Sequence, residues 1–215
     1  DVIIVVDVFS FTTCVDVAVS RGVSIWPARP GEPVSAPPGA VVAGRRGHAE
    51  YSLSPASFRT APEGLHCVLP SPNGGPLARA AAQTGAVVLA ACLRNAEAVA
   101  RDVASVGATF NVCPAGERWS DGSLRFAVED WIGAGAVLRG LPGRRSPEAA
   151  AAVAAFEQAR DDLLRVLAES VSGRELIELG YAGDVELASE LDVSGTVPRL
   201  VGEVFAAAQP HAGHQ

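Results

Sequence analysis

The sequence has no lysine, because all 17 basic residues among its 215 are arginine. Without a lysine amine the chain cannot form a Schiff base, and it cannot carry the lysine of a nucleotide-binding P-loop. Histidine is scarce as well, and two of the four, His211 and His214, lie in a polar tail. A histidine-based triad or a multi-histidine metal centre is therefore hard to build from His48 and His66 alone.

Long hydrophobic runs and an excess of positive charge are also absent. No run reaches the roughly 18 apolar residues of a membrane-spanning helix, so we expect no membrane span. The net charge is −7, and no basic run is longer than the pairs Arg45-Arg46 and Arg144-Arg145. This argues against a nucleic-acid binder but allows a small anionic substrate, which needs only a local positive site.

The four cysteines show no paired spacing, and each lies in or beside an apolar run. They are Cys14, Cys67, Cys92 and Cys113. This pattern is typical of buried thiols in a reducing compartment rather than of a disulfide framework or a zinc site. We therefore expect a cytoplasmic protein.

Six apolar runs rich in β-branched residues predict strands. They cover residues 2–9, 23–28, 40–44, 67–72, 86–93 and 109–113. Helical patterns follow the first, fourth and fifth runs directly, at 11–21, 76–84 and 95–106. Continuous apolar strands that alternate with helices predict an α/β fold, with a mostly parallel sheet and flanking helices.

From residue 124 onward the sequence predicts a C-terminal helical portion of the same domain. The expected helices cover 124–141, 147–171, 175–179, 185–191 and 197–208, with Ser146 as the N-cap of the second. We expect a single domain over 1–208, divided into a sheet-rich part, 1–123, and a helical part, 124–208. Residues 209–215 are predicted to form a mobile tail. Alanine-rich helix faces such as 149–155 leave room for a homodimer interface.

The segment Ser71-Pro-Asn-Gly-Gly75 contains an Asn-Gly pair, which normally predicts a two-residue β-hairpin. An alanine-rich helical run follows it and ends at Gly85, so the segment instead predicts a tight loop between a strand and a helix. Such a loop brings free backbone N–H groups together and attracts anions.

Polar residues follow several predicted strands at their carboxyl ends, where parallel sheets bind ligands. Asp7 ends the first strand, residues 71–75 follow the fourth, and Asn95 follows the fifth. Glu117 and Arg118 follow the sixth. We therefore expect these side chains to face one shared crevice.

Two acids are the main candidates for metal binding. Asp7 stands at a strand end, where a carboxylate can coordinate Mg²⁺ or accept local N–H groups. Asp130 lies on an apolar stripe of a predicted helix, and an acid there must be paired, capped or coordinated. Its neighbour Glu129 can instead form a surface ion pair with Arg125, four residues earlier.

An ordered set of short motifs runs along nearly the whole chain. The set comprises Asp7-Val8-Phe9 with Thr12-Thr13, Ser71-Pro72-Asn73-Gly74, Asn95-Ala96, Ala115-Gly116-Glu117, Glu129-Asp130 with Gly133-Ala134, and Asp192 with Val197-Pro198. In this order the motifs resemble the 2-phosphosulfolactate phosphatase family. The resemblance implies a magnesium-dependent α/β phosphatase of small phosphorylated 2-hydroxy acids, whose name-giving substrate, 2-phosphosulfolactate, is an intermediate towards coenzyme M.

The resemblance also implies roles for the crevice residues. Mg²⁺ held by Asp7 and Asp130, with Glu129 as a further candidate ligand, would polarise the phosphoryl group and activate a water. The catalytic candidates are Asp7, Asn73, Glu117 and Asp130. The candidates for binding phosphate are Thr12, Thr13, Ser71, Asn73, Gly74, Gly75, Asn95 and Arg118. Whether an acid acts as the general base or the activated water attacks directly stays open.

Three positions depart from the family pattern. Ser10 stands where an arginine is usual, Arg45 where an acid is usual, and Gly75 where a hydroxyl residue is common. Two hypotheses follow: a phosphatase with a shifted substrate, or a non-catalytic relative that binds an anionic metabolite or acts as an interaction protein.

Overall fold

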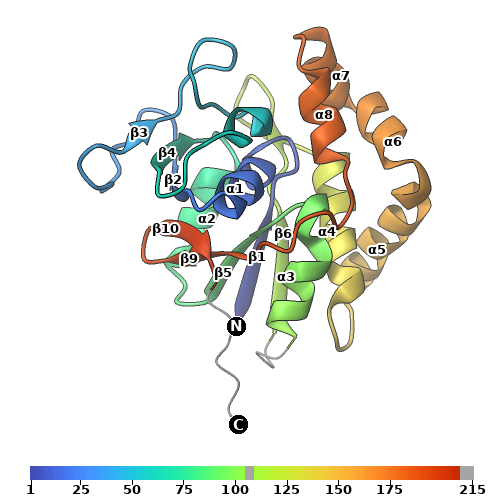
Figure 1. The fold of residues 1–215 in the computed structure, drawn as a ribbon. Helices are drawn as coiled ribbons and strands as arrows, with labels where there is room; N and C mark the ends of the chain where they lie inside the picture. Colours follow the sequence, from blue (N-terminus) through green and yellow to red (C-terminus); the bar gives the residue numbers. More distant parts are fainter. Residues whose placement is uncertain (105–108, 209–215) are drawn as a thin grey trace.

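A computed structural model describes residues 1–104 and 109–208. An eight-stranded sheet, in the order β3-β4-β2-β10-β9-β5-β1-β6, forms the centre of the molecule (Figure 1). The predicted tail at 209–215 and the last residues of the helix predicted over 95–106 lie outside the described residues.

All six predicted strands are confirmed. They are β1 (Val2–Val6), β2 (Ser24–Ala28), β3 (Val41–Val42), β4 (His66–Pro70), β5 (Val87–Ala91) and β6 (Phe110–Pro114). Strand β1 lies between β5 and β6 and is parallel to both, while β4 lies between β2 and β3 and is parallel to both. The mostly parallel sheet of an α/β fold is therefore confirmed.

The helix predicted over 197–208 is wrong, and so is the expectation that no strand follows residue 124. This segment forms a hairpin of two strands, β9 (Pro198–Val201) and β10 (Val204–Ala207). Strand β9 is antiparallel to β5 and β10 is antiparallel to β2, so the hairpin joins the two parallel groups. Gly202 makes the turn with φ of 61°. Burial in the sheet outweighs the helical propensity of the alanines here.

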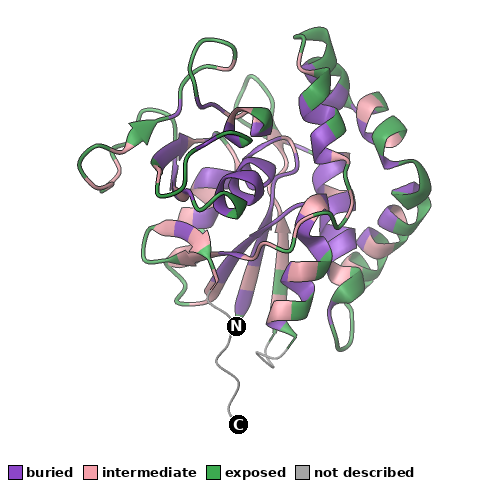
Figure 2. Cartoon of the chain, viewed as in Figure 1, coloured by how far each residue is buried: buried purple, intermediate pink, exposed green. Residues whose placement is uncertain are grey.

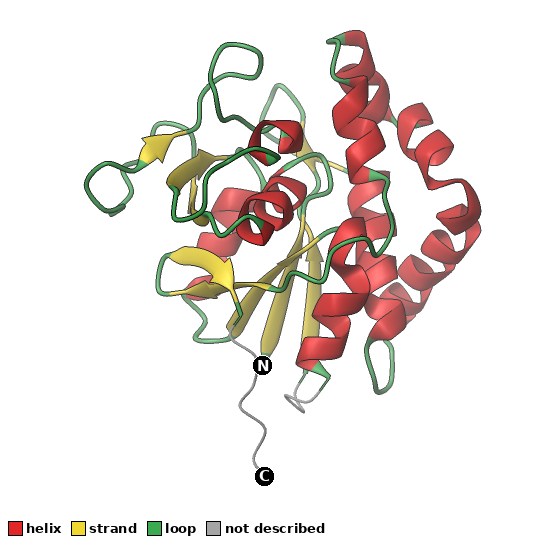
Figure 3. Ribbon diagram, viewed as in Figure 1, coloured by secondary structure: helices red, strands yellow, loops and turns green. Residues whose placement is uncertain are grey.

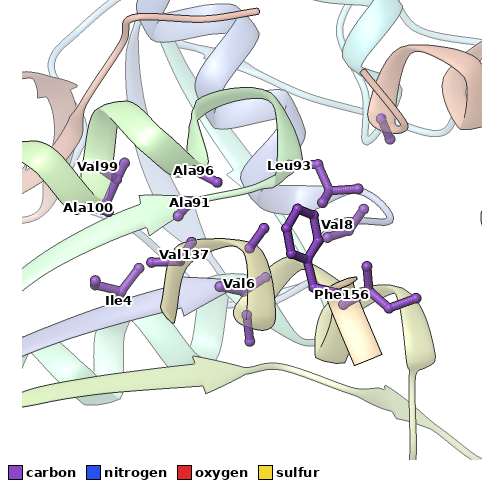
Figure 4. Packing of buried hydrophobic residues seen from close by; sticks show 14 of the residues in the cluster. Ile4, Val6, Val8, Ala91, Leu93, Ala96, Val99, Ala100, Val137 and Phe156 are labelled. Carbon is purple, nitrogen blue, oxygen red and sulfur yellow. The ribbon is translucent and has the colours of Figure 1, made fainter. Parts of the chain in front are cut away.

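Both faces of the sheet are covered. Successive side chains of a strand point to opposite faces. On β1, Ile4 and Val6 belong to one core cluster and Val5 belongs to another. The first cluster packs Ile4 and Val6 with Phe156 and with residues of the helices that follow the sheet (Figure 4).

Three helices connect the parallel strands: α1 (Phe11–Ser20), α2 (Gly74–Ala82) and α3 (Ala96–Val103). Short 3-10 turns precede two of the later elements, at η1 (Pro55–Phe58) and η2 (Leu93–Asn95). Helix α1 is buried along nearly its whole length (Figure 2). The predicted change from strand to helix after the Asn-Gly pair is confirmed, because α2 begins at Gly74.

The C-terminal helices are more divided than the sequence predicts. They are α4 (Val128–Gly140), α5 (Pro147–Ala159), η3 (Arg160–Asp162), α6 (Leu163–Glu169), α7 (Val171–Glu178) and α8 (Ala182–Ala188), and they group on one side of the sheet (Figure 3). Ser146 caps α5 as predicted, by accepting the N–H of Ala149 over 3.2 Å. No helix in the described ranges is long and apolar enough to cross a membrane.

The predicted helix at 124–141 begins later than expected. Residues 117–125 form a small hairpin of β7 (Glu117–Arg118) and β8 (Leu124–Arg125) before α4 starts. Arg125 therefore lies outside the helix, and its Nη2 pairs with Glu175 Oε2 at 2.9 Å. The i, i+4 pair expected between Arg125 and Glu129 is absent from the ion pairs of the described chain.

Candidate active site

A pocket of about 460 Å³ opens at the carboxyl ends of β1, β3 and β4. Loops after these strands supply most of its wall, and α7 with the residue that follows it covers one side. The polar lining residues are Asp7, Ser10, Arg45, Arg46, Ser71, Asn73, Glu117, Ser172 and Glu175. The apolar lining includes Phe9, Leu53, Leu176 and Leu179. Of the residues that the strand-end rule placed together, Asp7, Ser71, Asn73 and Glu117 line this pocket, whereas Asn95 and Arg118 do not.

The buried carboxylate of Asp7 joins the first residues of two helices. Its Oδ1 accepts the N–H of Phe11 over 3.1 Å, at the start of α1. Its Oδ2 accepts the N–H of Gly74 over 2.8 Å, at the start of α2. Helix N-termini favour negative charge, so both helices hold this carboxylate in place at the pocket wall.

Asp130, on the first turn of α4, makes a similar pair of bonds to two other loops. Its Oδ1 accepts the N–H of Val8 over 2.7 Å, and its Oδ2 accepts the N–H of Gly116 over 2.9 Å. This side chain is 3% exposed and does not line the pocket. Asp130 thus ties the loops after β1 and β6 to α4, directly beside Asp7.

Burial dominates the electrostatics of this acidic group. The pKa of Asp7 is raised to about 7, mainly by burial and to a smaller extent by the charges of Glu117 and Glu129, against the lowering effect of the Phe11 and Gly74 amides. Burial also raises the pKa of Asp130 well above its ordinary value, helped by repulsion from Asp7. The pKa of Glu129 is raised by burial too, although a bond from the Ser172 hydroxyl opposes the shift.

Asn73 and Glu117 come from different loops and meet in the pocket wall. The Asn73 side-chain Nδ2 donates to Glu117 Oε1 over 2.7 Å. The other end of the amide, Asn73 Oδ1, is buried and has no hydrogen-bond partner in the described chain. The Ser71 hydroxyl accepts the backbone N–H of Asn73 over 3.2 Å and so helps to hold this loop.

Close packing explains the two glycines that follow Asn73. A Cβ on Gly74 would stand 2.6 Å from Asp7 Oδ2, and one on Gly75 would stand 2.3 Å from the carbonyl oxygen of Ala28. The loop can approach Asp7 and β2 this closely only without side chains. The missing hydroxyl at position 75 is therefore a consequence of the local packing in this chain.

Several predicted phosphate-binding residues lie away from the pocket lining. The Thr12 hydroxyl donates to the Asp7 carbonyl over 2.8 Å, and the Thr13 hydroxyl donates to the Val8 carbonyl over 2.8 Å. Asn95 is fully buried, and its Oδ1 accepts the N–H of Cys92 over 2.9 Å. The Arg118 side chain donates to the Gly122 carbonyl over 3.1 Å. These side chains support loops around the site.

The oxygen donors in the pocket suit a magnesium ion. Within residues 1–104 and 109–208, no three His, Cys, Asp or Glu side chains form a metal cage by themselves. Mg²⁺ does not need one, because it keeps several waters and takes one or two carboxylates plus substrate phosphate. Asp7, Glu117 and the unpartnered Oδ1 of Asn73 offer hard oxygens, and the repulsion between buried acids favours a nearby cation.

Comparison with known proteins gives these residues a context. Residues 1–203 match the 2-phosphosulpholactate phosphatase family. The chain belongs to this family. The family match therefore includes the pocket, the acidic group beside it and the first strand of the C-terminal hairpin, β9.

Curated relatives carry the family name. A protein of Gloeobacter violaceus named "Probable 2-phosphosulfolactate phosphatase" is 35% identical over 53% of this chain and 46% of its own length. One of Carboxydothermus hydrogenoformans with the same name is 29% identical over 74% of this chain and 67% of its own length. The "2-phosphosulfolactate phosphatase" of Methanothermobacter thermautotrophicus is 32% identical over 51% of this chain. The chain thus spans about half the length of two of these relatives, 46% in each case.

Sequence reasoning missed two parts of the pocket of this family member. Arg45 and Arg46 follow β3, and the strand-end rule would have found them if applied to that strand. Ser172, Glu175 and Leu176 lie on α7 and also line the pocket. No sequence pattern marks them as pocket residues, because α7 follows another helix and not one of the strands that end at the pocket.

Proposed function

We propose that this protein is a magnesium-dependent phosphatase of a small 2-hydroxy acid phosphate, either 2-phosphosulfolactate or a related ester. The observation that carries the proposal is the meeting of Asp7, Asn73 and Glu117 in one pocket at the N-terminus of α2. Membership of the family and the names of the relatives support the same reaction.

The start of α2 provides for the phosphoryl group. A helix N-terminus offers backbone N–H groups and a partial positive charge to an anion. Asn73 precedes the helix and lines the pocket with Asp7, and Ser71 lies in the same wall. These groups orient the ester so that its phosphorus faces the acidic side of the pocket.

Asp7 and Asn73 Oδ1 would hold the magnesium ion, while Asp130 and Glu129 add negative charge behind them and Glu117 is left to act on the attacking water. When bound, the ion supplies Lewis acidity and charge neutralisation at the phosphoryl group. Asp130 acts as a positioning residue, because its two backbone bonds fix the loops that carry Asp7 and Glu117.

Glu117 is our candidate for the general base. Its Oε1 is occupied by the Asn73 Nδ2 and the backbone N–H of Arg118, at 2.7 and 2.8 Å. Within the described residues its Oε2 has no such partner. This oxygen can therefore accept a proton from the attacking water as the water oxygen bonds to phosphorus. In the same step the bond from phosphorus to the 2-oxygen of the hydroxy acid breaks, and that oxygen leaves and takes up a proton from solvent.

Release of inorganic phosphate from a panel of phosphorylated 2-hydroxy acids, with and without Mg²⁺, tests the proposal. We expect turnover only with Mg²⁺, and a loss of about 100-fold or more in Asp7→Asn and in Asp130→Asn. Asp161→Asn, at a carboxylate that is 96% exposed, is the matched control and should keep wild-type turnover. Turnover that ignores Mg²⁺, or that survives both substitutions, would sink the proposed mechanism.

A non-catalytic relative would behave differently in the same experiment. It would release no phosphate from any ester, yet anions with Mg²⁺ would still raise its melting temperature.

All four cysteines are free thiols, three of them buried, which supports the proposal of a reducing, cytoplasmic setting.

A further inference from the structure

Two consecutive arginines lie in the pocket wall on the loop after β3, and the side chain of Arg46 is paired with neighbouring groups there, although its Nε makes no hydrogen bond within the described chain. Its Nη2 donates to Ser10 Oγ over 2.7 Å and to the Leu53 carbonyl. Its Nε lies 3.4 Å from Asp184 Oδ2, and its guanidinium stands over the Tyr181 ring at 5.1 Å. Arg46 therefore connects the loops around the pocket, and its charge is offset by Asp184.

Arg45 lines the same pocket and is exposed, but its side chain has no partner. Within residues 1–104 and 109–208 its guanidinium makes no hydrogen bond, ion pair or ring contact. Its backbone is held, since its carbonyl oxygen accepts the N–H groups of His48 and Ala49 over 3.0 and 3.2 Å. The neighbouring Gly44 N–H donates to the Tyr51 carbonyl over 2.9 Å. The backbone of Arg45 is therefore held in place, while its guanidinium is unpaired within the described residues.

The other charges of the pocket leave Arg45 uncompensated. Glu175 lines the pocket, but its charge is paired with Arg125, which lies outside the lining, at 2.9 Å. Asp7 and Glu117 are the acids assigned above to the phosphoryl side. A substrate whose only anionic group is the phosphoryl group would bind at the acidic side of the pocket and at the start of α2. One positive charge would then remain without a counterpart.

We propose that Arg45 is a specificity-determining residue that binds a second anionic group of the substrate, a carboxylate or sulfonate that is not transferred. This inference rests on the proposed function for the identity of the ester. A guanidinium suits such a group because its fork of N–H donors matches two oxygens of a planar carboxylate or of a sulfonate. Esters without that group would bind through the phosphoryl side alone.

The test compares two esters that differ in one group, 2-phospholactate and isopropyl phosphate, in which a methyl replaces the carboxylate. We expect Arg45→Gln to lower kcat/KM for 2-phospholactate by about 10–100-fold, mainly through KM, and to leave isopropyl phosphate within about 2-fold. Arg45→Lys should recover part of the loss, because it keeps the charge but not the fork. A third ester with a sulfonate shows which anion Arg45 prefers.

Arg144→Gln is the matched control, since Arg144 is exposed at the opposite end of the sheet, beside the start of β6. Calorimetry with the phosphonate analogues of both esters, which cannot be hydrolysed, measures the same preference without turnover. A preference for the acid that is lost in Arg45→Gln supports the inference, even if the wild type releases no phosphate and the proposed function fails. An equal effect on both ligands, no effect, or the same loss in Arg144→Gln would overturn it.

Discussion

The side-chain Nδ2 of Asn73 donates to Glu117 Oε1 over 2.7 Å, and this bond fixes the orientation of the amide. A carboxylate only accepts hydrogen bonds, so the nitrogen must face Glu117 and Oδ1 must face away. Among residues 1–104 and 109–208 that buried Oδ1 has no hydrogen-bond partner, which is costly for a polar atom unless a ligand completes it. The pair also connects the loop after β4 to the loop after β6.

Asn73→Ala should therefore reduce turnover more than stability. Removing the amide takes one oxygen donor from the proposed ion and frees Glu117 to move, so we expect kcat to fall about 10–100-fold. Steady-state phosphate release measures the effect. Asn111→Ala, at an exposed position on β6, is the control and should match the wild type. A fall of the same size in both variants would show that the amide of Asn73 has no special role.

The raised pKa of Asp7 predicts how stability depends on pH without metal. Burial raises this pKa from 3.8 to about 7, so the native state keeps a proton that the unfolded chain loses. The resulting stabilisation is complete below the unfolded pKa and is lost as pH rises towards about 7. In metal-free buffer the melting temperature of the wild type should fall, relative to that of Asp7→Asn, between about pH 4 and pH 7.

Added Mg²⁺ provides the second part of this measurement. At about pH 8 it should raise the melting temperature of the wild type and leave Asp7→Asn unchanged. A difference between the two proteins that stays constant over the whole pH range would contradict the assigned pKa.

Gly75→Ala should destabilise the fold. The new Cβ would meet the Ala28 carbonyl oxygen at 2.3 Å, and backbone cannot yield as a flexible side chain can. We expect a loss of about 1–3 kcal/mol in the free energy of unfolding, measured with urea. Gly183→Ala in α8 is the matched control, because nothing lies within 4 Å of its Cβ. Equal stability of the two variants would rule out the close approach of this loop to β2.

Phe205→Ala tests the place of the C-terminal hairpin in the sheet. Phe205 is fully buried, with its ring centroid 6.2 Å from that of Phe11. Its truncation should lower the free energy of unfolding by about 3–5 kcal/mol. Val201→Ala, on the same hairpin but 63% exposed, should cost less than about 1 kcal/mol. Small, equal losses in both variants would mean that the hairpin lies outside the core.

The local sequence pattern was sufficient to predict an element of secondary structure where that element is a long or continuous apolar run. The six apolar runs predicted their strands because buried parallel strands need unbroken apolar sequence. The hairpin at 198–207 has two short strands, of which β10 contains two alanines, and its pairing with the distant strands β2 and β5 holds it extended. Its sequence, taken alone, is equally suited to a helix.

Some residues of the site could likewise be predicted from the sequence, and others could not. Asp7 and Glu117 could be placed in one crevice because strand ends converge in any parallel sheet. The roles of the Thr12 and Thr13 hydroxyls could not be predicted in this way. The sequence does not show whether a hydroxyl near a site bonds to the backbone or to the substrate. Only the fold shows that both donate to carbonyls of their own loop.

The position of the C-terminal hairpin has a consequence for how the protein is made. In the sheet of the described residues, β9 and β10, formed by residues 198–207, pair on one side with β2 of the β2-β4-β3 group and on the other with β5 of the β5-β1-β6 group. During synthesis the ribosome releases this segment last among the strands. The two groups of strands must therefore wait, with their inner edges unpaired, until residues 198–207 have emerged, and the nascent protein is exposed to wrong edge pairing throughout that interval.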